Sequence, residues 1–150
     1  MLARPPVFVE SYDGIGGLPF FTPDLDRDIG DPLLPAPVQE LRSAIASAHG
    51  IIISSPEYAH GVPGVLKNAL DWLVGGAEMV DRPVLLINTS PHSVHAIASL
   101  AETLRTMSAR LLPHSPCVVP MRRGASLDEM LRDAPFVEAL QVVLDPDAWR

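Results

Sequence analysis

The sequence predicts an α/β domain in which helices cover both faces of an open, mostly parallel sheet. Three observations support this class. Strand-like and helix-like segments alternate along the chain, and the strand-like runs are apolar without alternation, as in strands buried on both faces. The length of 150 residues suits one domain with a single core. We therefore expect residues 1–150 to form one domain.

Short apolar runs mark the expected strands. Val7-Phe8-Val9 is the first of these runs, and Ile51-Ile52-Ile53 and residues 84–87 are fully apolar. The last strand region is expected at Leu111-Leu112 and Cys117-Val118-Val119. The order of these runs, with helical segments between them, is typical of parallel strands joined by crossover helices.

Apolar residues at helical spacing predict helices at 38–48, 65–73 and 97–107. A further helical region lies near 127–144, and Pro135 is expected to interrupt it. Residues 19–37 are rich in proline and aspartate, which indicates a long surface connection.

The composition excludes several classes of partner. The net charge is -7, with 18 acidic against 11 basic residues, so neither nucleic acid nor an anionic membrane is expected as a partner. No apolar run approaches the ~18 residues of a membrane helix. Residues 1–6 contain two prolines where a signal peptide would be apolar, so we expect a cytoplasmic protein. The only cysteine, Cys117, is expected to be a buried strand residue.

Two predicted strands end in polar loops that contain proline, Ser54-Ser55-Pro56-Glu57-Tyr58 and Asn88-Thr89-Ser90-Pro91-His92. Ligands of such sheets bind outside the carboxyl ends of the strands. Each proline keeps its predecessor extended, so the chain turns abruptly after the strand. We expect the amides of Glu57, Tyr58 and Ala59 to point outward there.

Backbone donors beside the Tyr58 ring suit a flat heteroaromatic ligand with carbonyl groups along one edge, such as a flavin. Gly61, Pro63 and Gly64 then lead into the next helix without side-chain bulk. The alternative is an ordinary strand-to-helix connection in which Tyr58 serves packing. The residues alone leave both interpretations open.

The segment "PEYAHGVPGVLKNALDWL", residues 56–73, resembles the NADPH-dependent FMN reductases, which are flavodoxin-like enzymes that include quinone and chromate reductases. The resemblance continues in "VLLINTSPHSVHAIASLAETLRTMSA", residues 84–109, and in "YDGIGGLPFFTPDLD", residues 12–26. It implies a flavodoxin-like flavoprotein with FMN and NADPH or NADH as cofactors. The implied activity is an oxidoreductase that passes electrons from the nicotinamide to a flavin, a quinone or a similar small-molecule acceptor.

In that family the Pro-Glu-Tyr segment holds the isoalloxazine ring through backbone amides, and the loop after the next strand supplies a second ring contact. Many members have Asn where this chain has Ala59. No catalytic acid or base is expected, because the protein supplies position and hydrogen-bond donors. The resemblance therefore implies a cofactor site made of Pro56, Glu57, Tyr58, Ala59, Thr89, Ser90, Pro91 and His92.

The family begins with a strand and a Gly-Ser-x-Arg-type loop that binds the FMN phosphate, and this sequence has no such loop. Its Val7 segment aligns with the family's second strand, so the first βα unit, about 30 residues, is expected to be missing. Three explanations stay open. The start is mis-set or the chain shortened, a partner donates the strand, or the Val7 strand pairs beside the Ile51 strand in a four-stranded sheet.

The missing loop predicts weak or absent FMN binding. A charge-assisted hydrogen bond contributes roughly 1.5–3 kcal/mol. Losing three would remove about 4.5–9 kcal/mol, or on the order of 10³ to 10⁶ in affinity. The alternative function is therefore a non-catalytic, flavin-free remnant or an interaction subunit of the same fold.

Two other groups of residues permit further interpretations. His60, His92 and His95 could together bind zinc, but no carboxylate pattern supports this and no metal is expected. A serine hydrolase is disfavoured, because the sequence has no Gly-x-Ser-x-Gly segment. The helix that carries Lys67, Asn68, Asp71 and Trp72 serves either local packing or the interface of a homodimer or homotetramer, as the resemblance implies, with Trp72 half-buried.

Overall fold

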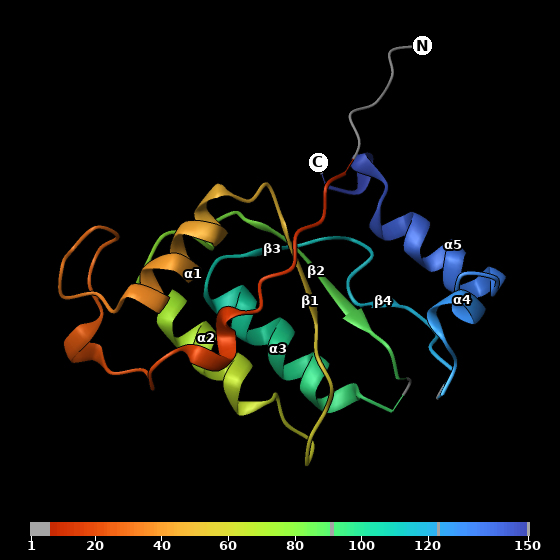
Figure 1. Cartoon of the computed structure of the whole chain (residues 1–150), viewed down its shortest axis with the longest axis horizontal. Coiled ribbons are helices and arrows are strands. Elements are labelled where there is room, and N and C mark those ends of the chain that lie inside the picture. The colour runs from red at the N-terminus through yellow and green to blue at the C-terminus, as the bar shows by residue number, and fades with distance from the viewer. Residues whose placement is uncertain (1–6, 91, 123, 150) are drawn as a thin grey trace, which may run out of the picture.

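The computed structural model describes residues 7–90, 92–122 and 124–149 (Figure 1). It contains a four-stranded sheet in which every pairing is parallel. Strand β2 is central and pairs with each of the other three strands. The predicted class, an open parallel α/β sheet, is confirmed. The strands are β1 (Ile51–Ser54), β2 (Pro83–Asn88), β3 (Arg110–Leu111) and β4 (Cys117–Val118).

The last strand region is split into two short pieces. β3 pairs with the start of β2, where Pro83 is opposite Arg110, and β4 pairs with its end, where Ile87 is opposite Cys117. Between these pieces the Leu86 N–H donates to the hydroxyl of Ser115 at 3.0 Å. A side chain thus satisfies the donor that the interrupted ladder leaves open.

Helices cover both faces of the sheet, as the sequence predicts. Figure 1 shows α1, α2 and α3 on one side of the strands and α5 on the other. Val84 and Leu86 of β2 pack into the core under the first three helices, whereas Leu85 packs toward α5 with Phe136 and Val143. The helices are α1 (Ala36–Ser47), α2 (Gly64–Val74), α3 (Val94–Thr106), α4 (Leu127–Met130) and α5 (Ala134–Val143), with short 3-10 helices η1 (Gly14–Gly17), η2 (Pro23–Leu25) and η3 (Pro146–Trp149).

The last helical region is interrupted, as predicted, but the break lies before Pro135. Residues 131–133 separate α4 from α5, and Pro135 lies in the first turn of α5. A proline fits there because the N–H that it lacks has no partner within the helix at that position. Among the described residues, no helix is both long enough and apolar enough to span a membrane.

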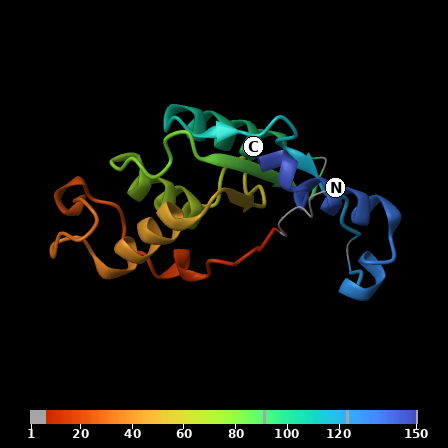
Figure 2. The same ribbon diagram turned by 90° about the horizontal axis from the view of Figure 1, so that it is seen from above.

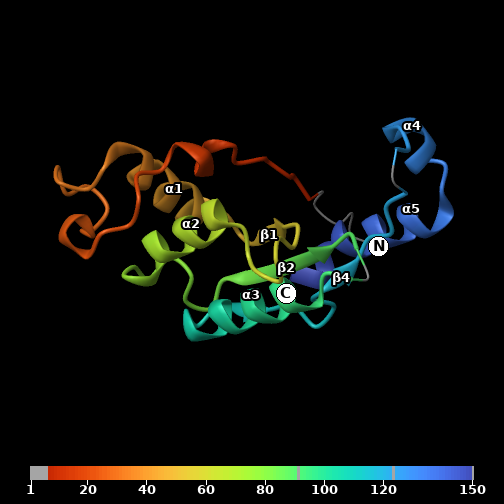
Figure 3. The same ribbon diagram turned by 90° about the horizontal axis from the view of Figure 1, so that it is seen from below.

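The prediction of a strand at Val7-Phe8-Val9 is wrong. These residues form no strand, and Phe8 and Val9 are 89% and 60% exposed. Figures 2 and 3 show the segment as an extended trace on the β1 side of the molecule. The pairing of a Val7 strand with the Ile51 strand is therefore wrong as well. Three apolar residues without a neighbouring strand gain too little burial to order into one. No described strand pairs with the outer edge of β1.

The connection before α1 is anchored on α2. Phe21 N–H donates to the Asn68 side-chain oxygen at 2.8 Å, and the carbonyl of Pro19 accepts from Asn68 Nδ2 at 3.0 Å and from Trp72 Nε1 at 2.8 Å. Phe21 also meets the Trp72 ring edge-on, with 5.1 Å between centroids. Trp72 is consequently 0% exposed, so its expected half-burial at a subunit interface is wrong.

A buried ion network joins this connection to α1 and to the turn before β2. Arg42 is 3% exposed, and its Nε donates to Glu78 Oε1 at 2.8 Å. Its Nη1 donates to the carbonyl of Arg27 at 2.7 Å and to Asp26 Oδ1 at 3.3 Å. The other oxygen of Glu78 is buried without a partner in the described part of the chain. Removing one member therefore leaves an uncompensated charge in the interior.

We expect Arg42→Met to lower the free energy of unfolding by about 3–5 kcal/mol, because Glu78 would remain buried without its counter-ion. The double variant Arg42→Met/Glu78→Leu removes both charges and should recover most of this loss. Urea unfolding followed by Trp fluorescence measures both values. A single variant within about 1 kcal/mol of the parent would contradict this role of the pair.

Candidate functional site

The two polar loops begin side by side. β1 and β2 are paired in parallel register up to Ser54 and Ile87, so both strands end at the same edge of the sheet. The first loop then leads to α2 and the second to α3. The residues predicted from the sequence to bind a ligand therefore lie on neighbouring loops at the carboxyl edge, where α/β sheets bind ligands.

The first loop contains a tight turn at Tyr58. The Tyr58 N–H donates to the Gly61 carbonyl at 3.2 Å, and the Gly61 N–H donates to the Tyr58 carbonyl at 2.9 Å. Between them Ala59 and His60 have φ values of 49° and 61°, which is the pattern of a type I′ turn. Positive φ costs a residue with a Cβ about 1–2 kcal/mol. This turn is therefore strained at both central residues.

The turn corrects one expectation about the backbone donors. The Tyr58 amide does not point outward, because it is bonded to Gly61. Among the described residues, no acceptor pairs with the amides of Glu57 and Ala59. The Tyr58 ring is 67% exposed beside them. We call the exposed surface formed by residues 56–59 the ring ledge, and it offers two donors where three were expected.

The carboxylate of Glu57 reaches the neighbouring helix. Its Oε2 accepts from the Ala96 N–H in the first turn of α3 at 2.8 Å. Ser93, at the N-cap position of α3, makes no side-chain cap bond. Glu57 thus satisfies one of the open donors of α3 from another loop, and its charge is favourable at the helix N-terminus. No local pattern indicated this contact, since Ser93 is itself a suitable cap residue.

The second loop uses its amides internally. The Ser90 N–H donates to Asn88 Oδ1 at 3.1 Å, the His92 N–H to Ser90 Oγ at 3.4 Å, and the Ser93 N–H to the Ser90 carbonyl at 3.1 Å. Thr89 and Ser90 are half-buried and His92 is exposed. Pro91 lies outside the described residues. The amides of Ser90, His92 and Ser93 are therefore paired within this loop.

Two of the three histidines considered as metal ligands pack against each other. The rings of His60 and His95 are stacked, with 4.3 Å between centroids and 24° between planes. Both side chains are exposed. In the described part of the chain, no group of three His, Cys, Asp or Glu side chains could hold a metal ion.

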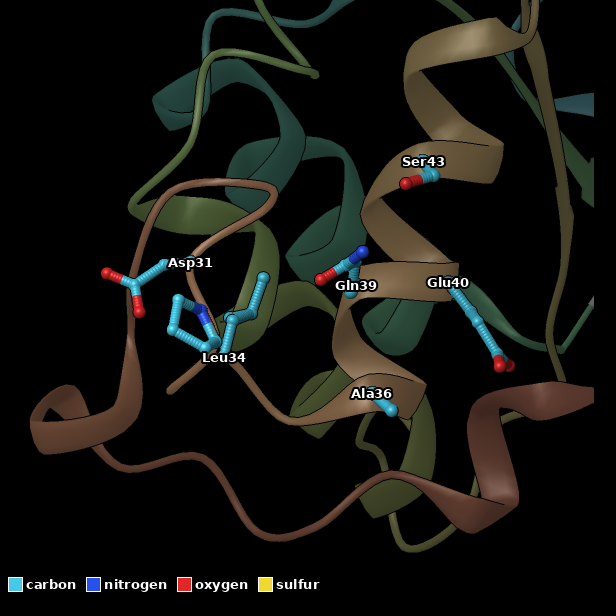
Figure 4. A pocket seen from close by; sticks show the side chains of 7 residues that line it. Asp31, Leu34, Ala36, Gln39, Glu40 and Ser43 are labelled. Carbon is cyan, nitrogen blue, oxygen red and sulfur yellow. The ribbon is translucent and has the colours of Figure 1, made fainter.

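A shallow cavity of about 400 Å³ lies elsewhere, between α1 and the connection before it (Figure 4). None of the residues predicted to bind flavin lines it. Figure 4 shows the Asp31 and Glu40 carboxylates on opposite sides of Gln39. Glu40 also acts on Tyr12, which lies outside the cavity lining. Burial raises the pKa of the Tyr12 phenol, and the negative charge of Glu40 raises it further as a smaller cause. Two carboxylates without a facing cation make this cavity unfavourable for a phosphate-bearing ligand.

The ring ledge fits the ring of a flavin. Two amides without acceptors lie next to an exposed aromatic side chain, and a flat ligand with carbonyl groups along one edge would satisfy both donors. The described residues include no Gly-Ser-x-Arg turn that could hold a phosphate group. The prediction that residues 56–59 bind the ring of FMN therefore stays a prediction, and these residues provide donors suited to it.

Comparisons with known proteins identify the family that this chain resembles. The sequence model of one family, described as NADPH-dependent FMN reductase, matches residues 9–123. The NADH:(hydroxy)cinnamate reductase subunit CrdA of Vibrio ruber is 37% identical over 101 residues, which cover 63% of this chain and 50% of that protein. A quinone reductase of Escherichia coli K12 is 37% identical over 90 residues, or 57% of this chain and 45% of that protein.

The fold has a similar counterpart among solved structures. FerB, a flavoenzyme NAD(P)H:(acceptor) oxidoreductase from Paracoccus denitrificans, superposes with a TM-score of 0.71 at 26% identity. The match covers 89% of this chain and 75% of FerB. The chain spans about half the length of the two curated relatives above.

The strained turn predicts a stabilising substitution. Asn tolerates positive φ better than Ala, so Ala59→Asn should raise the free energy of unfolding by about 0.5–1 kcal/mol. Ala77→Asn is the matched control, because Ala77 is an exposed turn residue without positive φ. Chemical denaturation measures both variants. An equal effect at the two positions would show that the turn geometry is not the cause.

The only cysteine is expected to react slowly. Cys117 is 8% exposed in β4, which confirms the expected buried strand residue, and burial raises the pKa of its thiol. Because the thiolate is the nucleophile, a disulfide reagent at pH 8 should modify the native chain about 100-fold more slowly than the urea-unfolded chain. The reaction is followed by absorbance of the released thiol. Comparable rates in both states would contradict the buried position.

Proposed function

The chain belongs to the NADPH-dependent FMN reductase family, and from this premise we propose that it is an FMN-dependent oxidoreductase. It takes electrons from NADPH or NADH and passes them to a quinone, a flavin or a similar acceptor. The observation that carries the proposal is the ring ledge, where the amides of Glu57 and Ala59 have no acceptor among the described residues beside the exposed Tyr58 ring.

The chain's own residues contribute position and hydrogen bonds. In this proposal the amides of Glu57 and Ala59 donate to ring carbonyls, and the exposure of the Tyr58 ring supports its contact with a flat ligand. The chemistry supplied by bound FMN is hydride transfer from a nicotinamide to an acceptor. No side chain is needed as an acid or base for that transfer. The Glu57 carboxylate is already engaged with Ala96, which supports a role for its backbone.

The names of the relatives support a small conjugated acceptor. One is named a quinone reductase and another a (hydroxy)cinnamate reductase subunit. We also propose that the protein is cytoplasmic and works as a homodimer, a homotetramer or a subunit with a further chain. The word subunit in the name of one relative supports the last of these possibilities.

Flavin titration of the 150-residue chain tests the proposal. We expect FMN to bind weakly, with a dissociation constant above about 1 μM, because the sequence given contains no Gly-Ser-x-Arg-type loop for the phosphate. Lumiflavin, which has the ring without the phosphate, should then bind within about ten-fold of FMN. Ring absorbance and fluorescence quenching measure both constants.

Turnover completes the test. NADPH or NADH oxidation with a benzoquinone acceptor should depend on the protein and rise with added FMN until the site is filled. Free FMN with the acceptor, and the heat-denatured chain with FMN, are the controls. A chain that binds neither flavin and adds nothing to the control rate would refute the enzyme and support the flavin-free alternative.

A further inference from the structure

Two contacts join the first loop to α3. The Glu57 carboxylate accepts from the Ala96 N–H at 2.8 Å, and the His60 ring stacks on the His95 ring at 4.3 Å between centroids. The α3 partners in these two contacts, Ala96 and His95, both lie in the first turn of that helix. We call this pair of contacts the loop clasp. It connects residues that lie more than thirty positions apart in the chain.

The loop clasp encloses a strained turn. Ala59 and His60 have positive φ, a conformation that persists only where the surroundings determine it. Two backbone hydrogen bonds between Tyr58 and Gly61 close the turn, but they do not fix its orientation relative to the sheet. The contacts of Glu57 and His60 with α3 supply that orientation.

The clasp also determines where the free donors of the ring ledge point. One of these amides belongs to Glu57, whose own carboxylate is held by α3. The other belongs to Ala59, which directly precedes His60, whose ring is held by His95. Neither contact uses the amide of Glu57 or that of Ala59. A loop that lost the clasp would keep both amides but could no longer present them in one arrangement.

We propose that Glu57 and His60 are positioning residues, which hold the ring ledge in the arrangement that binds a flavin ring by fastening it to the first turn of α3. Glu57 acts through Ala96, and His60 acts through His95. This inference rests on the proposed function, because it concerns the same flavin site. It assigns the two side chains roles that are separate from ligand contact and from proton transfer.

The proposal predicts different results for closely related variants. Glu57→Ala removes the bond to Ala96, whereas Glu57→Gln keeps an oxygen that can accept it. His60→Ala removes the ring stack, whereas His60→Phe keeps it. We expect lumiflavin affinity to fall by about ten-fold or more in both alanine variants. It should stay within about three-fold of the parent in the Gln and Phe variants.

Amide hydrogen exchange on the flavin-free chain provides a readout that does not depend on the ligand. Exchange at Gly61 and Ala96 should quicken in Glu57→Ala by about ten-fold and stay close to the parent rate in Glu57→Gln. Glu129→Ala is the matched control, because Glu129 also caps a helix with its carboxylate, at Ser126. It should change neither the exchange at Gly61 and Ala96 nor the lumiflavin affinity.

The outcomes separate this inference from the proposed function. If Glu57→Ala quickens exchange but binds lumiflavin as tightly as the parent, the clasp exists and its positioning role is wrong. If Glu57→Gln loses affinity as fully as Glu57→Ala while Ala96 stays protected, the charge matters and the hydrogen bond does not, which also overturns the proposal. If the parent itself binds no lumiflavin, the proposed function fails first, and the positioning role fails with it.

Discussion

The structure depends on the parallel pairing of β2 with its three neighbours. Val84, Leu85 and Leu86 are all at most 2% exposed, because successive side chains of a strand point to opposite faces and both faces are covered. One face holds α1, α2 and α3, and the other holds α5. The same pairing brings the carboxyl ends of β1 and β2 together. The arrangement that builds the core therefore also builds the edge of the sheet at which the candidate site lies.

The buried ion pair that stabilises the fold and the contacts next to the proposed ligand site lie at opposite ends of β2. The buried charges of Arg42 and Glu78 tie α1 to the turn before β2, at the amino end of that strand. The loop clasp of Glu57 and His60 lies at the other end, beyond the carboxyl edge, and consists of one hydrogen bond and one ring stack. The first network involves desolvated charges, whereas the second is partly exposed. Local opening is therefore expected to cost less free energy at the loops beyond the carboxyl end of β2 than at its amino end.

Much of the fold was predictable because the signals were local. Unbroken apolar runs at Ile51-Ile52-Ile53 and 84–87 identified β1 and β2, although the isoleucines of β1 are half-buried where full burial was expected, and helical spacing identified the three long helices. The prediction of a strand at Val7 was wrong because a strand requires a neighbouring strand to pair with, and a run of apolar residues does not reveal whether one is present. The burial of Trp72 depends on the carbonyl of Pro19, which lies 53 positions away. No sequence pattern around α2 could have indicated that residues 19–21 pack over Trp72.

The position of the candidate loop at the end of β1 was predictable, but its local geometry was not. The Pro-Glu-Tyr segment and its position after a buried strand located the ring ledge. The predicted number of free donors was wrong, because the Tyr58 amide is bonded within a turn. The positive φ values of that turn could not be predicted from the residue types of Ala59 and His60. A family preference for Asn at Ala59 was the one available signal, since Asn tolerates that conformation. The contact of Glu57 with Ala96 spans 39 positions and has no local signature.

The split of the last strand region affects how this sheet could meet other chains. β3 and β4 are two residues each, and residues 112–116 leave the line of the strand between them. That side of the sheet therefore presents no continuous row of backbone donors and acceptors, which is the template for edge-to-edge aggregation. The outer edge of β1 is unbroken and carries three consecutive isoleucines. Within the described part of the chain, growth of the sheet by an added strand is consequently favoured at the backbone edge of β1, whose isoleucine side chains pack into the core on both faces.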